Sequence, residues 1–128
     1  MVPAGLRRWL EGGRTGVKVC GVTREEDALA AIEAGVDALG FNFYPRSKRV
    51  VRLTDVADWI ARLPPEIGRV AVVVDPEDGV LRELRDTGLF HAIQFHGGET
   101  PEFCARHTAG FYLKACALSG DASAQAAE

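Results

Sequence analysis

The sequence of 128 residues lacks several features that would assign it to a special class of protein. It has no long run of charges of one sign, and 15 basic against 18 acidic residues give a net charge of only −3. We therefore expect no nucleic-acid partner. It also has no apolar run of the length that a signal peptide or a membrane span needs. These absences favour a cytoplasmic protein that binds a small molecule and does not contact membranes.

Cysteine is scarce, and the few cysteines are not arranged in pairs. Cys20, Cys104 and Cys116 are odd in number and lack CxxC spacing, which argues against disulfide bonds and against a metal site. What the sequence does contain is the composition of a folded domain, with 47% hydrophobic and 26% charged residues.

Short apolar runs alternate with helical patterns along the chain, as in βαβ units. The predicted strands span residues 17–20, 38–44, 70–74, 92–96 and 111–116. The predicted helices span about 24–34, 54–63 and 76–88, and a fourth begins at a cap formed by Thr100. A capping box of Thr23 and Glu26 is expected to start the first helix, and Thr54 the second.

Side chains in the predicted strands alternate between apolar and polar. The polar set is Lys18, Cys20, Asn42, Gln94, His96 and Lys114, and the apolar set, expected to face the helices, is Val17, Val19, Leu39, Phe41, Phe43, Ile93, Phe95 and Leu113. Polar residues near the carboxyl ends of strands suit the interior mouth of a β/α barrel. An open doubly wound sheet would carry them mainly in its loops. We therefore predict an α/β fold of the (β/α)8 TIM-barrel type.

The number of strands is too small for a closed barrel, which needs eight strands and roughly 200 or more residues. We expect residues 17–128 to be the N-terminal portion of an incomplete barrel, and residues 121–128 to begin a further helix. Residues 1–16 form an N-terminal extension with three alternative explanations. It is a flexible segment, a short helix that plugs the bottom of the barrel, or the product of an upstream start codon.

One segment resembles a known family. Residues 18–24, Lys-Val-Cys-Gly-Val-Thr-Arg, resemble the K-[IV]-C-G-[IVL]-[TK] opening of phosphoribosylanthranilate isomerases. Further family-like landmarks follow in order: Gly35, Leu39-Gly40-Phe41, Ser47 and Arg49, Gln94-Phe95-His96-Gly97, and Lys114-Ala115. Together they extend over nearly the whole chain after residue 16.

The resemblance implies an isomerase of tryptophan biosynthesis that uses no cofactor. The implied reaction is an acid/base Amadori rearrangement of N-(5-phosphoribosyl)anthranilate to 1-(o-carboxyphenylamino)-1-deoxyribulose 5-phosphate. It also implies that Cys20 is the general base and that Arg49 faces the anthranilate carboxylate. The family's general acid, an aspartate at the end of strand six, has no counterpart here. Its phosphate loops after strands seven and eight are also absent, so we expect the chain alone to lack full activity.

Three other polar residues of the strands are candidates for substrate binding. Lys18 lies two residues before Cys20 on the same face, where an ammonium group favours the thiolate, and both substrate contact and a structural role are open to it. Gln94 and His96 are expected to line the pocket. Asp75 precedes Pro76, and we interpret it as a helix N-cap rather than as an acid catalyst.

Two alternatives to the isomerase hypothesis follow from the same sequence. The first is a noncatalytic half-barrel module that binds an aromatic or phosphorylated ligand and dimerises. The second is another phosphosugar enzyme with the same barrel. In either case, open strand edges predict self-association of the chain or association with a missing C-terminal half.

Overall fold

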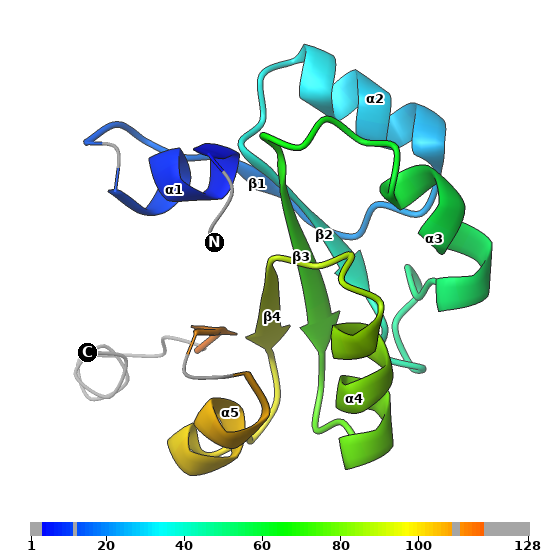
Figure 1. The fold of residues 1–128 in the computed structure, drawn as a ribbon, viewed down its shortest axis with the longest axis vertical. Coiled ribbons are helices and arrows are strands. Elements are labelled where there is room, and N and C mark those ends of the chain that lie inside the picture. The colour runs from blue at the N-terminus through cyan, green and yellow to red at the C-terminus, as the bar shows by residue number, and fades with distance from the viewer. Residues whose placement is uncertain (1–3, 12, 109–110, 117–128) are drawn as a thin grey trace.

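The structure, a computed structural model, describes residues 4–11, 13–108 and 111–116. The predicted helix at 121–128 lies outside these residues. The elements follow one another in strict alternation after the first helix (Figure 1). They are α1 (Ala4–Glu11), β1 (Lys18–Val19), α2 (Glu25–Glu33), β2 (Ala38–Asn42), α3 (Leu53–Ile60), β3 (Gly68–Val73), α4 (Asp78–Asp86), β4 (Ala92–Phe95), α5 (Pro101–Thr108) and β5 (Leu113–Lys114).

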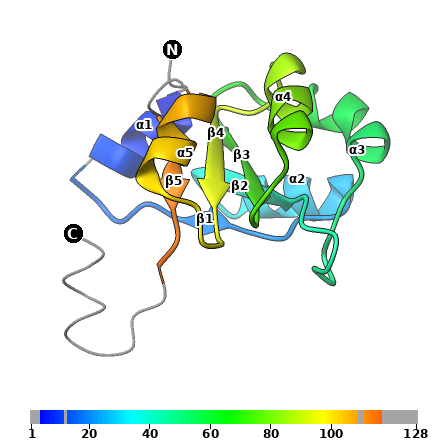
Figure 2. The same cartoon turned by 90° about the horizontal axis from the view of Figure 1, so that it is seen from below.

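The five strands form one parallel sheet in the order β1-β2-β3-β4-β5. In a β/α barrel, neighbouring strands follow one another in the order of the sequence. In a doubly wound sheet, the strand order reverses at a switch point. In Figure 1, α2, α3, α4 and α5 follow one another in an arc around the strands. Seen from below in Figure 2, α3 and α4 lie on one side of the strands and α1 on the other. The predicted barrel architecture is therefore confirmed for its first five strands.

The outer face of the sheet is covered by the helices and forms most of the core. Leu39 and Phe41 of β2 pack with Ile60 of α3, and all three side chains are fully buried. Ile93 and Phe95 of β4 belong to a second cluster, which includes residues of α4 and α5. Each such side chain stabilises the fold by about 1.5–3 kcal/mol when it is fully buried. The predicted apolar face of these two strands is thus confirmed.

The inner face of the sheet carries a smaller core that α1 completes. Leu6 of α1 is fully buried there, in a cluster with Ala38, Val70, Val72 and Ala92. A Cβ added at Gly68 would lie 3.1 Å from the Cβ atoms of both Leu6 and Ala38, so the helix approaches the strand where a side chain is missing. Within the extension the structure has a short helix, and it lies against the amino ends of β2 and β3.

The prediction for the two faces of β5 is wrong. Leu113 pairs with Gln94 and packs on the inner cluster, while Lys114 pairs with Phe95. The side-chain period of a strand is two, so a shift of one residue exchanges the faces completely. A strand of two residues offers too few positions for the hydrophobic pattern to fix that choice.

The predicted helix caps agree with the structure at Thr100 and disagree at Thr23, Thr54 and Asp75. The capping box at Thr23 is wrong, because α2 starts after Arg24, which makes no side-chain cap hydrogen bond. Thr54 lies inside α3 rather than before it. Thr100 does cap α5, since its Oγ1 accepts a hydrogen bond of 3.1 Å from the backbone N–H of Phe103. Neither α2 nor α3 has a side-chain hydrogen bond from its N-cap residue, and both pack on the core through buried residues such as Ala28 and Val56.

Replacement of Leu6 by alanine should destabilise the protein by about 2–4 kcal/mol, because the change leaves a cavity in the inner cluster. The free energy of unfolding from urea titration measures the effect. Leu10→Ala is the matched control on the same helix, where the side chain is 44% exposed, and should cost less than about 0.5 kcal/mol. Equal losses in the two variants would mean that α1 is not docked on the sheet.

The stability of the protein should fall as the pH drops below about 6.5 through a contribution of His91. Its Nδ1 accepts a hydrogen bond of 3.0 Å from the backbone N–H of Arg69. Burial, and then the charge of Arg69, lowers the pKa of His91 from its ordinary value of 6.5. The unfolded chain therefore takes up the proton first as the pH falls, which favours unfolding.

Urea titrations between pH 5 and pH 8 test this contribution. His91→Asn keeps a hydrogen-bond acceptor but removes the titrating group, so its stability should depend less steeply on pH than that of the wild type. For one proton the difference in slope cannot exceed about 1.4 kcal/mol per pH unit. Leu10→Ala, at an exposed position and without loss of a titrating group, is the control and should keep the wild-type slope. An unchanged slope in His91→Asn would contradict the assignment.

Candidate active site

Lys18 and Cys20 lie side by side on the inner face of the sheet, over Gly40 of the neighbouring strand. A Cβ added at Gly40 would lie 2.9 Å from the Sγ of Cys20 and 3.2 Å from the Nζ of Lys18. The missing side chain therefore provides the space in which the thiol and the ammonium group meet. Cys20 is exposed and Lys18 is half-buried, so the thiol is accessible from the open side of the sheet.

The turn after Cys20 brings Arg49 to the same place. Gly21 has a φ of 81°, which glycine adopts without strain, and its N–H donates a 3.0 Å hydrogen bond to the carbonyl of Gly40. A Cβ at Gly21 would lie 2.5 Å from the Cδ of Arg49 and 3.1 Å from its Nη1. The side chain of Arg49 thus lies directly on this turn. Its loop is fixed in part by Ser47, whose Oγ accepts a 3.1 Å hydrogen bond from the Arg49 N–H.

Gln94 and His96 point to the same inner face from β4, two strands away from β2. Gln94 pairs with Val72 and Leu113, and its Oε1 is buried with no hydrogen-bond partner. His96 is exposed at the end of the strand, and its N–H donates a 2.9 Å hydrogen bond to the carbonyl of Val73. The structure therefore brings Lys18, Cys20 and Arg49 together and leaves Gln94 and His96 as a second group on the same face.

Asp75 does not cap α4, which corrects the interpretation made from the sequence. The residue before α4 is Glu77, and Asp75 has a φ of 43° in the preceding loop. Its Oδ1 accepts a 2.9 Å hydrogen bond from the N–H of Gly98, in the loop after β4. A Cβ at Gly97 would lie 2.8 Å from the Asp75 carboxylate. Asp75 therefore ties two loops together at the carboxyl edge of the sheet.

Glu99 is the residue of this region that the sequence did not single out. Its side chain is only 2% exposed and accepts hydrogen bonds from the N–H of Asp75 at 2.7 Å and of Gly97 at 2.9 Å. The Nζ of Lys114 lies 2.8 Å from the Glu99 Oε1 and also donates to the carbonyl of Gly97. Acidic residues in polar loops are usually solvated, and only the adjacent Gly97-Gly98 pair indicated a close backbone approach.

The charge of Glu99 is stabilised by these partners. Burial alone would raise the pKa of the Glu99 carboxyl, but the hydrogen bond from Lys114 and those from the backbone N–H groups lower it below its ordinary value. By contrast, burial raises the pKa of the Cys104 thiol inside α5. Cys104 is thus a packing residue, whereas Cys20 is exposed on the inner face of the sheet.

Cys20 and Arg49 have side chains of the types that can act as a base and bind a carboxylate. A thiolate is a competent base, and a guanidinium group binds carboxylates through parallel hydrogen bonds. Asp75 and Glu99 are occupied by loop N–H groups, so within the described part of the chain neither carboxylate at this edge is free to act as a general acid. Nor do the described residues contain a group of three or more His, Cys, Asp or Glu side chains that could hold a metal ion.

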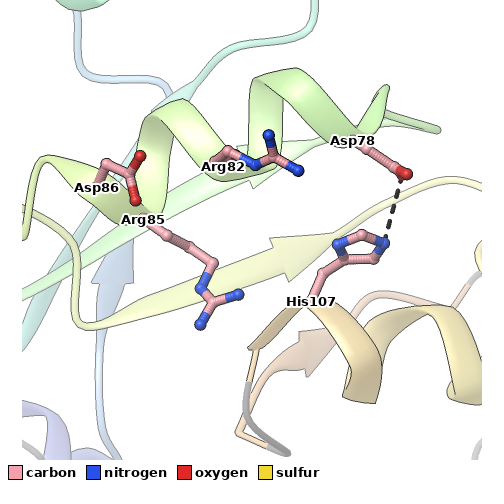
Figure 3. Close-up of a pocket in the computed structure, with 5 residues that line it drawn as sticks. All are labelled: Asp78, Arg82, Arg85, Asp86 and His107. Carbon is pink, nitrogen blue, oxygen red and sulfur yellow. Dashed lines mark ion pairs between the residues drawn. The ribbon is translucent and has the colours of Figure 1, made fainter.

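A separate polar cavity of about 340 Å³ lies between α4 and α5, on the helix side of the sheet (Figure 3). In the close-up, Asp78 of α4 points toward His107 of α5, and the two side chains form an ion pair of 3.3 Å. The cavity is therefore part of the contact between two helices, away from the inner face that carries Cys20. None of the helices described above is long and apolar enough to cross a membrane.

Comparison with known proteins gives a consistent result. A family model described as N-(5'phosphoribosyl)anthranilate (PRA) isomerase matches residues 17–125. The N-(5'-phosphoribosyl)anthranilate isomerase of Pseudomonas syringae pv. tomato is 46% identical over 110 residues, which are 85% of this chain and 53% of that protein. The Nitrosospira multiformis enzyme is 43% identical over 99 residues, which are 77% of this chain and 47% of that protein.

Solved structures agree with this match. The phosphoribosyl anthranilate isomerase of Thermotoga maritima superposes with a TM-score of 0.83 at 36% identity, over 89% of this chain and 56% of that one. A structure of such an isomerase with reduced 1-(o-carboxyphenylamino)-1-deoxyribulose 5-phosphate has the same TM-score and identity, and the match covers 89% of this chain and 59% of that one. This chain spans about half the length of the relatives it matches.

Replacement of Gly40 by alanine should disturb the inner face specifically. The added Cβ would collide with Cys20 and Lys18, and we expect a loss of about 1–3 kcal/mol in the free energy of unfolding. Gly79→Ala is the matched control, because a Cβ there meets no atom within 4 Å and the residue lies in α4. It should be neutral or stabilising by up to about 1 kcal/mol. A Gly40→Ala variant as stable as the Gly79→Ala variant would contradict the geometry described for Cys20.

Proposed function

This chain belongs to the N-(5'-phosphoribosyl)anthranilate isomerase family, and we propose that it carries the general base and the carboxylate-binding group of that enzyme. The proposed reaction converts N-(5'-phosphoribosyl)anthranilate to 1-(o-carboxyphenylamino)-1-deoxyribulose 5-phosphate in tryptophan biosynthesis. A cytoplasmic location remains a prediction from the sequence.

The observation that carries the proposal is the contact of the Arg49 side chain with the turn that follows Cys20. In the proposed reaction, a proton is added to the ring oxygen as the sugar opens to a Schiff base. A proton is then removed from C2 to give an enolamine, which tautomerises to the ketone. Cys20 would accept the C2 proton, and Arg49 would hold the anthranilate carboxylate beside it. Substrate and base would then be fixed by two neighbouring loops.

The remaining candidates are proposed to assist in binding. The ammonium group of Lys18 lies with the Cys20 thiol over Gly40 and would contact the substrate there. Gln94, with a buried oxygen that has no partner, and His96 would line the side of the pocket away from Cys20. Asp75 and Glu99 at this edge are occupied by loop N–H groups, so the general acid and the phosphate-binding loops would come from the half of the enzyme that this chain does not span.

A noncatalytic half-barrel that associates with a partner is the alternative with an observation in its favour. Val17 and Val19 beside and within β1 are 47% and 38% exposed, and Phe111 before β5 is 37% exposed. Apolar side chains at both edge strands are typical of surfaces that another segment covers. A different phosphosugar enzyme with the same barrel is disfavoured, since the family match extends over residues 17–125.

A chimera in which this chain is followed by the C-terminal half of the Pseudomonas syringae relative tests the proposal. The decrease of anthranilate-type fluorescence, with substrate generated in situ, reports turnover. We expect an active chimera in which Cys20→Ala lowers kcat by about 10²–10⁴-fold, because the general base is lost. Cys116→Ala is the matched control at another exposed cysteine and should stay within about threefold of the parent.

Two results would count against the proposal. Full activity in Cys20→Ala would exclude Cys20 as the base. A chimera that folds but neither turns over substrate nor binds the reduced product analogue would exclude the isomerase function itself and favour the noncatalytic alternative.

A further inference from the structure

We propose that Glu99 is a positioning residue, whose carboxylate fixes the loops after β3 and β4 and thereby orients His96 toward the ligand. The inference rests on the proposed function, in which His96 lines the substrate pocket. Glu99 itself has no part in that chemistry, since its side chain is 2% exposed and faces the loops rather than the inner face.

The carboxylate of Glu99 joins three segments that are distant in sequence. One oxygen accepts from the N–H of Asp75, in the loop after β3, at 2.7 Å. The other accepts from the N–H of Gly97 at 2.9 Å and contacts the Nζ of Lys114, on β5, at 2.8 Å. A buried carboxylate is costly to desolvate unless it is paired and hydrogen-bonded, and both oxygens meet this condition.

A second carboxylate makes the connection reciprocal. Asp75 accepts a 2.9 Å hydrogen bond from the N–H of Gly98, while Glu99 accepts one from the N–H of Asp75. The Asp75 backbone has a φ of 43°, in the left-handed region that only a few non-glycine residues adopt. Such a conformation persists where surrounding contacts hold it, and it is concentrated at functional sites. The two loops are therefore held as one unit.

The two connected loops, after β3 and after β4, extend as far as His96. The residue before it, Phe95, is fully buried, and the residue after it, Gly97, is held through both its N–H and its carbonyl. The N–H of His96 itself donates to Val73. With both neighbours fixed, the backbone sets the direction of the Cα–Cβ bond of His96, whose side chain is exposed and has no hydrogen-bond partner among the described residues.

The test compares Glu99→Gln with Glu102→Gln, an exposed glutamate in the first turn of α5. Glutamine keeps the shape but cannot accept from both N–H groups or neutralise Lys114. We expect amide hydrogen exchange at Asp75 and Gly97 to rise about tenfold or more in Glu99→Gln. The NMR signals of the His96 ring should shift in the same variant. Glu102→Gln should match the wild type in both measurements.

Binding of reduced 1-(o-carboxyphenylamino)-1-deoxyribulose 5-phosphate separates positioning from a purely structural role. Positioning predicts a Kd about tenfold weaker in Glu99→Gln, with an unchanged rate of Cys20 alkylation. A variant with a lower unfolding midpoint but wild-type affinity and an unshifted His96 signal would overturn the inference. These Kd values are measured in the chimera with the C-terminal half of the Pseudomonas syringae relative. If the unmutated chimera does not bind the analogue, the proposed function fails, and the His96 and amide signals alone decide whether Glu99 orients this turn.

The wild-type chain provides a measurement that does not depend on the folding of a variant. Acid titration followed by NMR should move the His96 ring signals in step with protonation of Glu99, whose pKa lies below that of an ordinary glutamate. Glu99→Asp, which keeps the charge but shortens the reach, should restore part of the affinity lost in Glu99→Gln. His96 signals that stay constant while Glu99 titrates would overturn the inference.

Discussion

The parallel pairing of β3 with β2 on one side and with β4 on the other is the constraint on which the other features depend. Because all strands run in the same direction, the residues that end each strand meet along one edge, and the residues that begin each strand meet along the other. Cys20 and His96 therefore share an edge although 75 residues separate them in the numbering. The loops of that edge can differ in length and sequence without any change in the sheet that holds them.

The inner face of the first two strands and of β4 could be predicted from the sequence. Residues in a strand alternate strictly, so the position of Cys20 relative to Lys18 follows from local spacing alone. The family resemblance then added Arg49, which no periodic pattern could connect with β1. The structure supplies the reason for that connection, since Gly21 leaves room for the arginine side chain.

The features that the sequence did not reveal depend on contacts with residues that are distant in the sequence. The environment of Glu99 depends on the N–H of Asp75 and the ammonium group of Lys114, which lie beside its carboxylate only in the folded chain. The exchange of faces in β5 has the same origin, because its register is fixed by β4 and not by its own two residues. The cap predictions were wrong for α2 and α3, whose N-cap residues make no side-chain hydrogen bond to the first turn. Local patterns thus identified the helices and strands. Contacts between residues far apart in the sequence determine which face each side chain takes and which partners it has.

The position of α1 has a consequence for how the sequence of this chain can vary during evolution. The helix lies at the amino edge of the sheet, and its buried Leu6 is outside the region that matches the family. The stability that Leu6 contributes therefore comes from the edge of the sheet opposite the proposed site at the carboxyl edge. A lineage could gain or lose this helix while its chemistry is held constant, and a change that weakens the loops near Cys20 could be offset from the opposite end of the sheet.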